Sequence, residues 1–224
     1  MTQEIRANLD RVLERIAGAA ERSGRRAADV LLIAVSKTVE AARVAEAIKA
    51  GVPALGENRV QEAKGKIAEL GRAVPWHLIG HLQSNKAKDA VELFDLIHSI
   101  DGVALARECD RRAAARGRAV DVLIEVNVGG EAAKSGVAPD AVAGLLDEIR
   151  ALTHVRVRGL MTIPPIGAPE ESRPWFQALR KLGERHGLRE LSMGMSSDFE
   201  VAIEEGATMV RVGTAIFGPR PVRA

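Results

Sequence analysis

The stretch VLLIAVSKT at 30–38 carries the pattern that decides the fold. Its first six residues are all aliphatic, as in a parallel strand that is buried on both faces. An amphipathic stretch with helical spacing follows at 39–50. This unit, a short aliphatic run and then a helical pattern, recurs along the chain, and it is the βα unit of an α/β protein.

Aliphatic runs of this kind occur at 30–35, 53–57, 76–80, 93–99, 121–128, 155–163, 190–194 and 208–213. Helical patterns lie between them, for example at 39–50, 60–70, 103–115, 141–152, 174–186 and 199–205. Eight alternating units predict a (β/α)8 barrel, the TIM barrel. An open doubly wound sheet is the alternative, and the even number of runs and the missing GxGxxG motif favour the barrel.

An additional amphipathic helix is predicted before the first run, at 3–24. Its apolar residues fall at helical spacing, and they are Ile5, Leu9, Val12, Leu13 and Ile16.

Length and composition limit the possible classes of protein. The chain has 224 residues, which we interpret as a single domain at 1–224. Lys plus Arg total 32 against 30 Asp plus Glu, so bulk charge does not favour a nucleic-acid partner. Without an apolar run of about 20 residues, no membrane span is expected. The one cysteine and the charged N-terminus, which lacks a secretory signal, favour a cytoplasmic location.

Polar residues follow the predicted strands, and in such a barrel the active site is built from residues at these ends. Lys37 ends the first run. A lysine placed there would be partly desolvated, which lowers its pKa and frees its amine for Schiff-base chemistry. The alternative is that its stem packs on the barrel and its ammonium reaches solvent.

The loops after the seventh and eighth runs favour an anion site. GMSSDFE places Ser196, Ser197 and Asp198 before a helix, and VRVGTAIFG places Gly213 and Thr214 before another. Barrels often bind a phosphate with these two loops, through backbone N–H groups and a helix N-terminus. Each polar residue could instead be an ordinary helix N-cap.

No metal site is predicted. His77 and His81 are four residues apart, but they lie in a predicted strand, where that spacing separates them along its length. The Glu of the HExxH motif is also missing. Cys109 lies in a helical stretch and is interpreted as a packed thiol.

Seven motifs resemble one known family. They are AVSKT (34–38), GENRVQEAKGK (56–66), WHLIGHLQSNK (76–86), KSG (134–136), GLMTI (159–163), LSMGMSSDFEVAI (191–203) and VRVGTAIFG (210–218). In this order they are similar to the YggS/PROSC family, the pyridoxal phosphate homeostasis proteins. The resemblance covers nearly the whole chain.

The resemblance implies a barrel like the N-terminal domain of alanine racemase, with pyridoxal 5′-phosphate (PLP) at its mouth. By motif match, Lys37 forms the Schiff base with PLP, and Ser196, Gly213 and Thr214 hold its phosphate. Arg211 faces the pyridine nitrogen, while Asn58 and Met161 line the ring. Ser197 and Arg59 depart from the family pattern, so the resemblance assigns them no role.

The family and the composition together favour a PLP carrier over an enzyme. Alanine racemases use a lysine and a tyrosine as their two bases, and this chain has no tyrosine and lacks the length for the racemase's second domain. An arginine beside the pyridine nitrogen also weakens the ring as an electron sink. We therefore expect a monomer that holds PLP reversibly and buffers it or delivers it to apo-enzymes.

Two other functions stay open. One is a PLP-dependent racemase or lyase with weak one-base activity, for which His81 or Cys109 are the candidate second bases. The other is an aldolase that uses Lys37 without a cofactor and binds a substrate phosphate.

Overall fold

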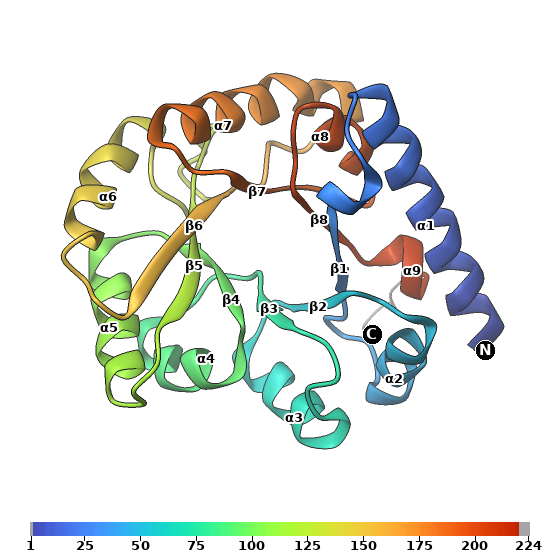
Figure 1. The fold of residues 1–224 in the computed structure, drawn as a ribbon, viewed down its shortest axis with the longest axis horizontal. Coiled ribbons are helices and arrows are strands. Elements are labelled where there is room, and N and C mark those ends of the chain that lie inside the picture. Colours follow the sequence, from blue (N-terminus) through green and yellow to red (C-terminus); the bar gives the residue numbers. More distant parts are fainter. Residues whose placement is uncertain (1, 220–224) are drawn as a thin grey trace.

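The computed structural model describes residues 2–219. Eight parallel strands form a closed barrel, with each strand beside the next one in the sequence (Figure 1). The strands are β1 (Leu31–Val35), β2 (Ala54–Glu57), β3 (Trp76–Leu78), β4 (Leu96–Ile100), β5 (Val120–Glu125), β6 (Val155–Met161), β7 (Glu190–Met195) and β8 (Met209–Val212). Pairing of β1 with β8 closes the ring and confirms the predicted (β/α)8 barrel over the open sheet.

Helices surround the strands (Figure 1). They are α1 (Thr2–Arg22), α2 (Ala41–Ala50), α3 (Val60–Leu70), α4 (Ala87–Leu93), α5 (Val103–Ala114), α6 (Val142–Ile149), α7 (Arg173–His186), α8 (Phe199–Glu204) and α9 (Thr214–Phe217). Short 3-10 turns occur at Ala27–Asp29, Ser84–Lys86, Pro139–Ala141 and Pro169–Ser172. Across residues 2–219, none of the helices combines the length and the hydropathy that crossing a membrane requires.

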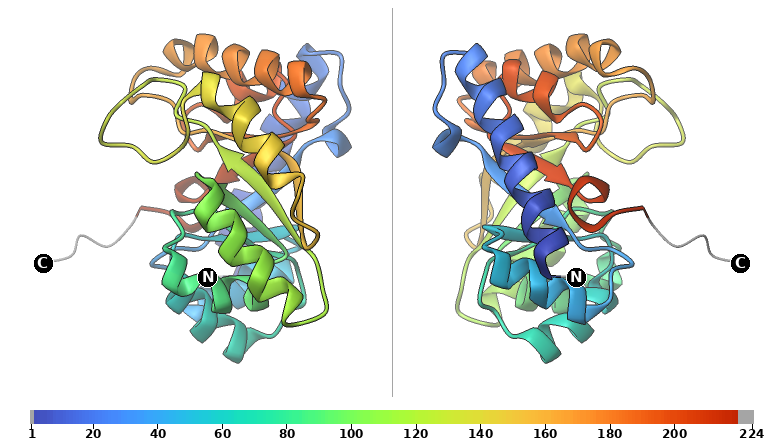
Figure 2. Two further views of the ribbon diagram at one scale, coloured as in Figure 1. Left: turned by 90° about the vertical axis from the view of Figure 1, so that its left-hand side faces the viewer. Right: turned by 90° about the vertical axis from the view of Figure 1, so that its right-hand side faces the viewer.

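The N-terminal helix covers the place where the ring closes. The helix after β8, α9, has only four residues and is too short to cover the strands. Helix α1 packs against α2, α8 and α9 and lies diagonally across this side of the barrel (Figure 2). Its contact face includes Ile5, Leu9, Val12 and Ile16, which are all buried. Leu13 is 40% exposed, so its assignment to the apolar face was wrong: it lies about 100° around the helix from Val12.

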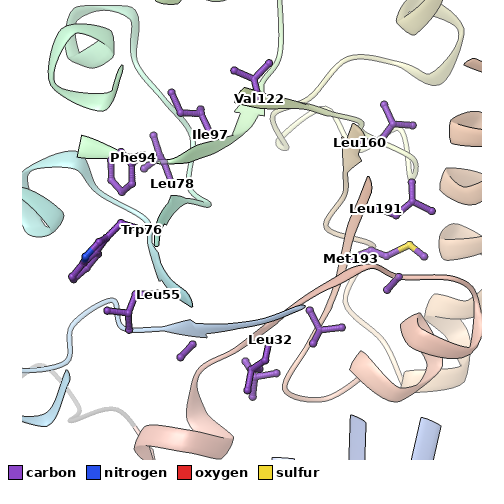
Figure 3. Close-up of a cluster of buried hydrophobic side chains, with 14 of the residues drawn as sticks. Leu32, Leu55, Trp76, Leu78, Phe94, Ile97, Val122, Leu160, Leu191 and Met193 are labelled. Atoms are coloured by element: carbon purple, nitrogen blue, oxygen red, sulfur yellow. The ribbon is translucent and has the colours of Figure 1, made fainter. Parts of the chain in front are cut away.

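The barrel has two apolar layers, because successive side chains of a strand point to opposite faces. Leu32, Leu55, Trp76 and Leu160 lie on the outer side of the strand ring, in the layer that packs against the helices (Figure 3). A smaller cluster is separate from this layer and fills the barrel interior. It consists of Ile33, Ala54, Leu96, Leu123, Met161 and Met209.

Several strands are shorter than the aliphatic runs that predicted them. The run at 93–99 starts inside α4, because the helix end and the strand are both buried and apolar there; Phe94 is fully buried, and β4 begins only at Leu96. The runs at 76–80 and 155–163 each extend two residues past the ends of β3 and β6, and these extensions include Ile79 and Ile163, respectively. These two residues lie at the mouth of the barrel.

Candidate functional site

A cavity of about 310 Å³ lies at the carboxyl ends of the strands. Its walls come from the ends of β1, β2, β3, β6, β7 and β8. The lining residues are Val35, Lys37, Asn58, Ile79, Ile163, Met195, Ser196, Ser197, Arg211, Gly213 and Thr214. The structure therefore brings together six of the seven residues predicted for the site, all except Met161.

Lys37 lies at the wall of this cavity, just past the end of β1. The side chain before it, Ser36, is fully buried on the other face of the strand, where its hydroxyl donates to Glu57 Oε1 at 2.7 Å. Alternation along the strand then turns Lys37 toward the barrel mouth. Its neighbour Thr38 has a φ of 63°, the one positive φ outside glycine in residues 2–219.

The loops after β7 and β8 meet at the cavity. The Gly213 N–H donates to Ser196 Oγ at 3.2 Å and ties the two loops together. Asp198 does not serve the cavity, because its carboxylate accepts from the Met195 N–H at 2.6 Å and from Ser172 Oγ at 3.2 Å. Ser197 does line the cavity. This end of β7 therefore offers two hydroxyls to a ligand while the acid is held within the turn.

Glycine permits the sharp end of β7. Gly194 has a φ of 90°, and a Cβ there would lie 2.5 Å from the Ala202 Cβ. Any larger residue would push α8 away from the strand and displace the Ser196 loop.

Arg211 forms the floor of the cavity and is only 3% exposed. Its guanidinium donates to Ser192 Oγ at 2.7 Å and to the Thr162 carbonyl oxygen at 2.9 Å. Burial lowers the pKa of Arg211 to about 10, so the side chain is still cationic at neutral pH. A permanent positive charge thus lies beneath the site.

Two histidines continue this hydrogen-bond chain through the barrel interior. His98 Nδ1 lies 2.9 Å from Ser192 Oγ, and His77 Nδ1 lies 3.0 Å from His98 Nε2. Burial lowers the pKa of His77 to about 4 and that of His98 well below its usual value, so both rings are neutral at pH 7. No sequence pattern indicates these hydrogen bonds, because the four residues come from four different strands.

The hydrogen bonds in the chain run in one direction. Arginine can only donate, so Ser192 accepts from Arg211. Within residues 2–219 the Ser192 hydroxyl has no acceptor but His98 Nδ1, so it donates there. His98 then carries its proton on Nε2 and donates to His77 Nδ1. Arg211 therefore fixes the tautomers of both histidines.

Asn58 and Met161 differ in position. Asn58 lines the cavity where the ends of β2 and β3 come close, and a Cβ on Gly80 would lie 2.4 Å from the Asn58 carbonyl oxygen. Met161 is fully buried in the interior cluster and is not among the lining residues. Ile163, two residues further on, lines the cavity from the same strand end. Contact of Met161 with a ring stays a prediction.

The remaining candidates lie outside this cavity. Cys109 is fully buried in α5, and burial raises the pKa of its thiol to about 12. His81 lines an adjoining cavity of about 240 Å³ with Glu125 and Lys134, and Arg59 lines a surface groove of about 540 Å³. In the part of the chain that is described, no three His, Cys, Asp or Glu side chains gather as metal ligands would.

The fold and the site define a barrel of the alanine racemase type. Residues 4–221 match the family model "Alanine racemase, N-terminal domain". An alanine racemase of Clostridium difficile shares the fold with a TM-score of 0.75 at 17% identity, over 98% of this chain and 57% of that one. At this identity the likeness concerns the fold alone.

Closer relatives define the family. The pyridoxal phosphate homeostasis protein of Aquifex aeolicus is 48% identical over 220 residues, 95% of this chain and 96% of that protein. The structure of PipY from Synechococcus elongatus with PLP bound is 42% identical with a TM-score of 0.78, over 92% of this chain and all of that one. The chain belongs to the family of pyridoxal phosphate homeostasis proteins.

Proposed function

We propose that this protein binds PLP reversibly through Lys37 and acts in PLP homeostasis by buffering the cofactor or delivering it. The observation that carries the proposal is the single cavity that joins the Lys37 side chain, the Ser196 and Thr214 hydroxyls and the buried Arg211 guanidinium. The PLP-bound PipY structure supports it, since PipY has the same fold at 42% identity.

The cavity fits the size and chemistry of this cofactor. Small-molecule sites measure roughly 300–1,000 Å³, and this one, at about 310 Å³, suits a small flat ligand. Val35, Ile79 and Ile163 supply apolar walls for a ring. A Cβ on Gly213 would lie 3.2 Å from the Val35 carbonyl oxygen, so glycine lets the loop after β8 lie close to the end of β1.

Each residue then has a defined task. PLP supplies an aldehyde that condenses reversibly with a primary amine, and Lys37 provides that amine. Ser196, Gly213 and Thr214 hold the phosphate through hydroxyl and backbone groups. Arg211 would donate toward the pyridine nitrogen and, being cationic, would keep that nitrogen unprotonated. Asn58 would contact the ring edge, and Met161, which does not line the cavity, would support it only from the interior cluster.

We further propose that the protein carries PLP without turning over a substrate. A two-base reaction needs a second acid or base at the cavity, and the chain has no tyrosine. Cys109 is buried in α5 with a raised thiol pKa, and His81 faces the adjoining cavity. Neither former candidate lines the cavity of Lys37, which favours the carrier over a racemase or lyase.

Transfer and turnover are separated by one set of assays. The PLP-loaded, desalted protein is mixed with an apo PLP enzyme, and the recovered activity is followed; separately, racemisation of an L-amino acid is compared with that by free PLP. We expect transfer to the apo-enzyme and a racemisation rate no higher than that of free PLP. Faster turnover, lost in Lys37→Ala, would favour the racemase or lyase instead.

Location and assembly belong to the same proposal. The single free thiol of Cys109 suits a reducing cytoplasm. A monomer would leave the cavity mouth accessible to a recipient enzyme. Light scattering of the loaded protein tests this, and a stable dimer would contradict it.

A further inference from the structure

A buried lysine lies directly behind Lys37 on the other side of the strand. Lys66, on α3, has a side chain that is only 8% exposed. Its ammonium donates to the Ser36 carbonyl oxygen at 2.6 Å, to Glu57 Oε1 at 2.7 Å and to Glu62 Oε1 at 2.9 Å. All three donors of the ammonium are used. We call Lys66, Glu57 and Glu62 the anchoring cluster.

The anchoring cluster contacts the backbone on both sides of Lys37. On one side, Lys66 binds the Ser36 carbonyl and Glu57 accepts from the Ser36 hydroxyl at 2.7 Å. On the other side, Glu62 Oε1 accepts from the Thr38 N–H at 2.5 Å. The turn at 36–38 is therefore held from behind at the two positions that flank Lys37.

The held backbone has a conformation that threonine rarely adopts. Thr38 has a φ of 63°, which is unusual for a β-branched residue and persists only where the surroundings impose it. The hydrogen bond from its N–H to Glu62 is such a constraint. Uncommon conformations of this kind concentrate at functional sites, where they orient a neighbouring group.

Stability alone gives a weak reason for a buried cluster of charges. Well-packed apolar residues in place of a buried ion pair are often as stable or more so. Glu57 is fully buried, and within the described residues its Oε2 has no hydrogen-bond partner. Burial raises the pKa of Glu57, and the hydrogen bonds from Lys66 and Ser36 oppose this. An orienting role accounts for a group that is costly to bury.

We propose that Lys66, Glu57 and Glu62 are positioning residues for Lys37. They fix the backbone at Ser36 and Thr38 so that the Lys37 amine enters the cavity at the place where the PLP aldehyde arrives. This inference rests on the proposed function, because that function makes Lys37 the amine that reacts with PLP. The anchoring cluster does not itself touch the cavity, and it acts only through the turn at 36–38.

The first test compares two lysines of the same helix. Lys66→Met removes the buried ammonium, whereas Lys64→Met removes an exposed one that pairs with Asp89 at 3.4 Å. The rate of PLP uptake is followed by absorption and by borohydride trapping on Lys37. We expect Lys66→Met to slow trapping by about tenfold or more, as a misplaced reacting group does, and Lys64→Met to match the wild type. A folded Lys66→Met with the wild-type rate would overturn the proposal.

A second measurement separates positioning from general damage to the cavity. PLP affinity is measured by equilibrium dialysis in Lys37→Ala, with and without Lys66→Met. If the cluster acts through Lys37, Lys66→Met has no effect once that amine is absent. If Lys66→Met weakens PLP binding equally in the wild type and in Lys37→Ala, the role of the cluster is merely structural and the inference is rejected.

A third variant guards against failure to fold. Glu62 is partly exposed; Glu62→Gln keeps an acceptor for the Thr38 N–H, and Glu62→Ala removes it. We expect slow trapping in the alanine variant only, and equal rates in both would contradict the proposal. If the wild type takes up no PLP, the proposed function fails by itself. The rate at which trinitrobenzenesulfonate modifies Lys37 then still tests positioning, and rates equal to wild type in Lys66→Met and Glu62→Ala would reject it.

Discussion

Ser192 is one of the two hydrogen-bond acceptors that hold the buried guanidinium of Arg211. It accepts from Arg211 at 2.7 Å and is fully buried, so Ser192→Ala leaves one guanidinium donor and His98 Nδ1 without partners. We expect a loss of about 1–3 kcal/mol in the free energy of unfolding, the usual cost of buried unsatisfied groups. Urea denaturation measures it, with the exposed Ser84→Ala as control. Equal effects of the two variants would mean that the chain of hydrogen bonds contributes nothing.

His77 makes stability depend on pH. Its pKa in the folded protein is about 4, below the ordinary 6.5, so the unfolded chain binds the proton more readily between these values. The contribution of His77 to the free energy of unfolding is therefore complete above pH 6.5 and is lost as the pH falls toward 4. Between pH 7 and pH 5 the expected loss is about 2 kcal/mol from this group.

Urea denaturation at pH 7 and pH 5 tests this sign. His77→Gln should flatten the dependence relative to the wild type. A steeper fall in His77→Gln, or stability that rises toward pH 5 in the wild type, would contradict the assignment of a neutral buried imidazole.

At the scale of the element, α1 offers a direct comparison of two leucines. Leu9 is 1% exposed against the barrel, and Leu13, one turn further on, is 40% exposed. We expect Leu9→Ala to lower the free energy of unfolding by about 2–5 kcal/mol and Leu13→Ala by less than about 1 kcal/mol. Urea denaturation distinguishes them. Comparable losses would mean that α1 does not dock as described.

The elements also show what sequence can predict here. Eight aliphatic runs located the eight strands, because strands buried on both faces leave an uninterrupted apolar pattern. Their ends were less accurate: the run at 93–99 joined a helix end to a strand, since both are buried. Leu13 was assigned to the packed face because it is apolar, although the helix turns it toward solvent.

The site residues that follow strand ends were predictable from the sequence, whereas those defined only by tertiary contacts were not. Lys37, Ser196, Gly213 and Thr214 follow strand ends, so the barrel rule was enough to find them. Lys66 was not found, because in sequence a buried lysine looks like any helix-surface lysine. The hydrogen bonds that link His77 to Arg211 were not predicted for another reason. Residues of the barrel interior become neighbours only when the ring closes.

At the scale of the whole molecule, closure of the ring creates the site. Ile33 of β1 pairs with Arg211 of β8, which brings the Lys37 turn beside the Gly213–Thr214 loop although they lie near opposite ends of the chain. Covering this seam requires α1, because α9 is too short. The amine and the proposed phosphate loop therefore depend on the same closed barrel.

The most direct test of the account is the visible absorption spectrum after PLP is added and the protein is desalted, with wild type beside Lys37→Ala and the surface variant Lys64→Ala. We predict a yellow band in the wild type and in Lys64→Ala that borohydride fixes onto Lys37, and no such band in Lys37→Ala. A wild type without the band would contradict the PLP assignment and favour an aldolase that uses Lys37 without a cofactor.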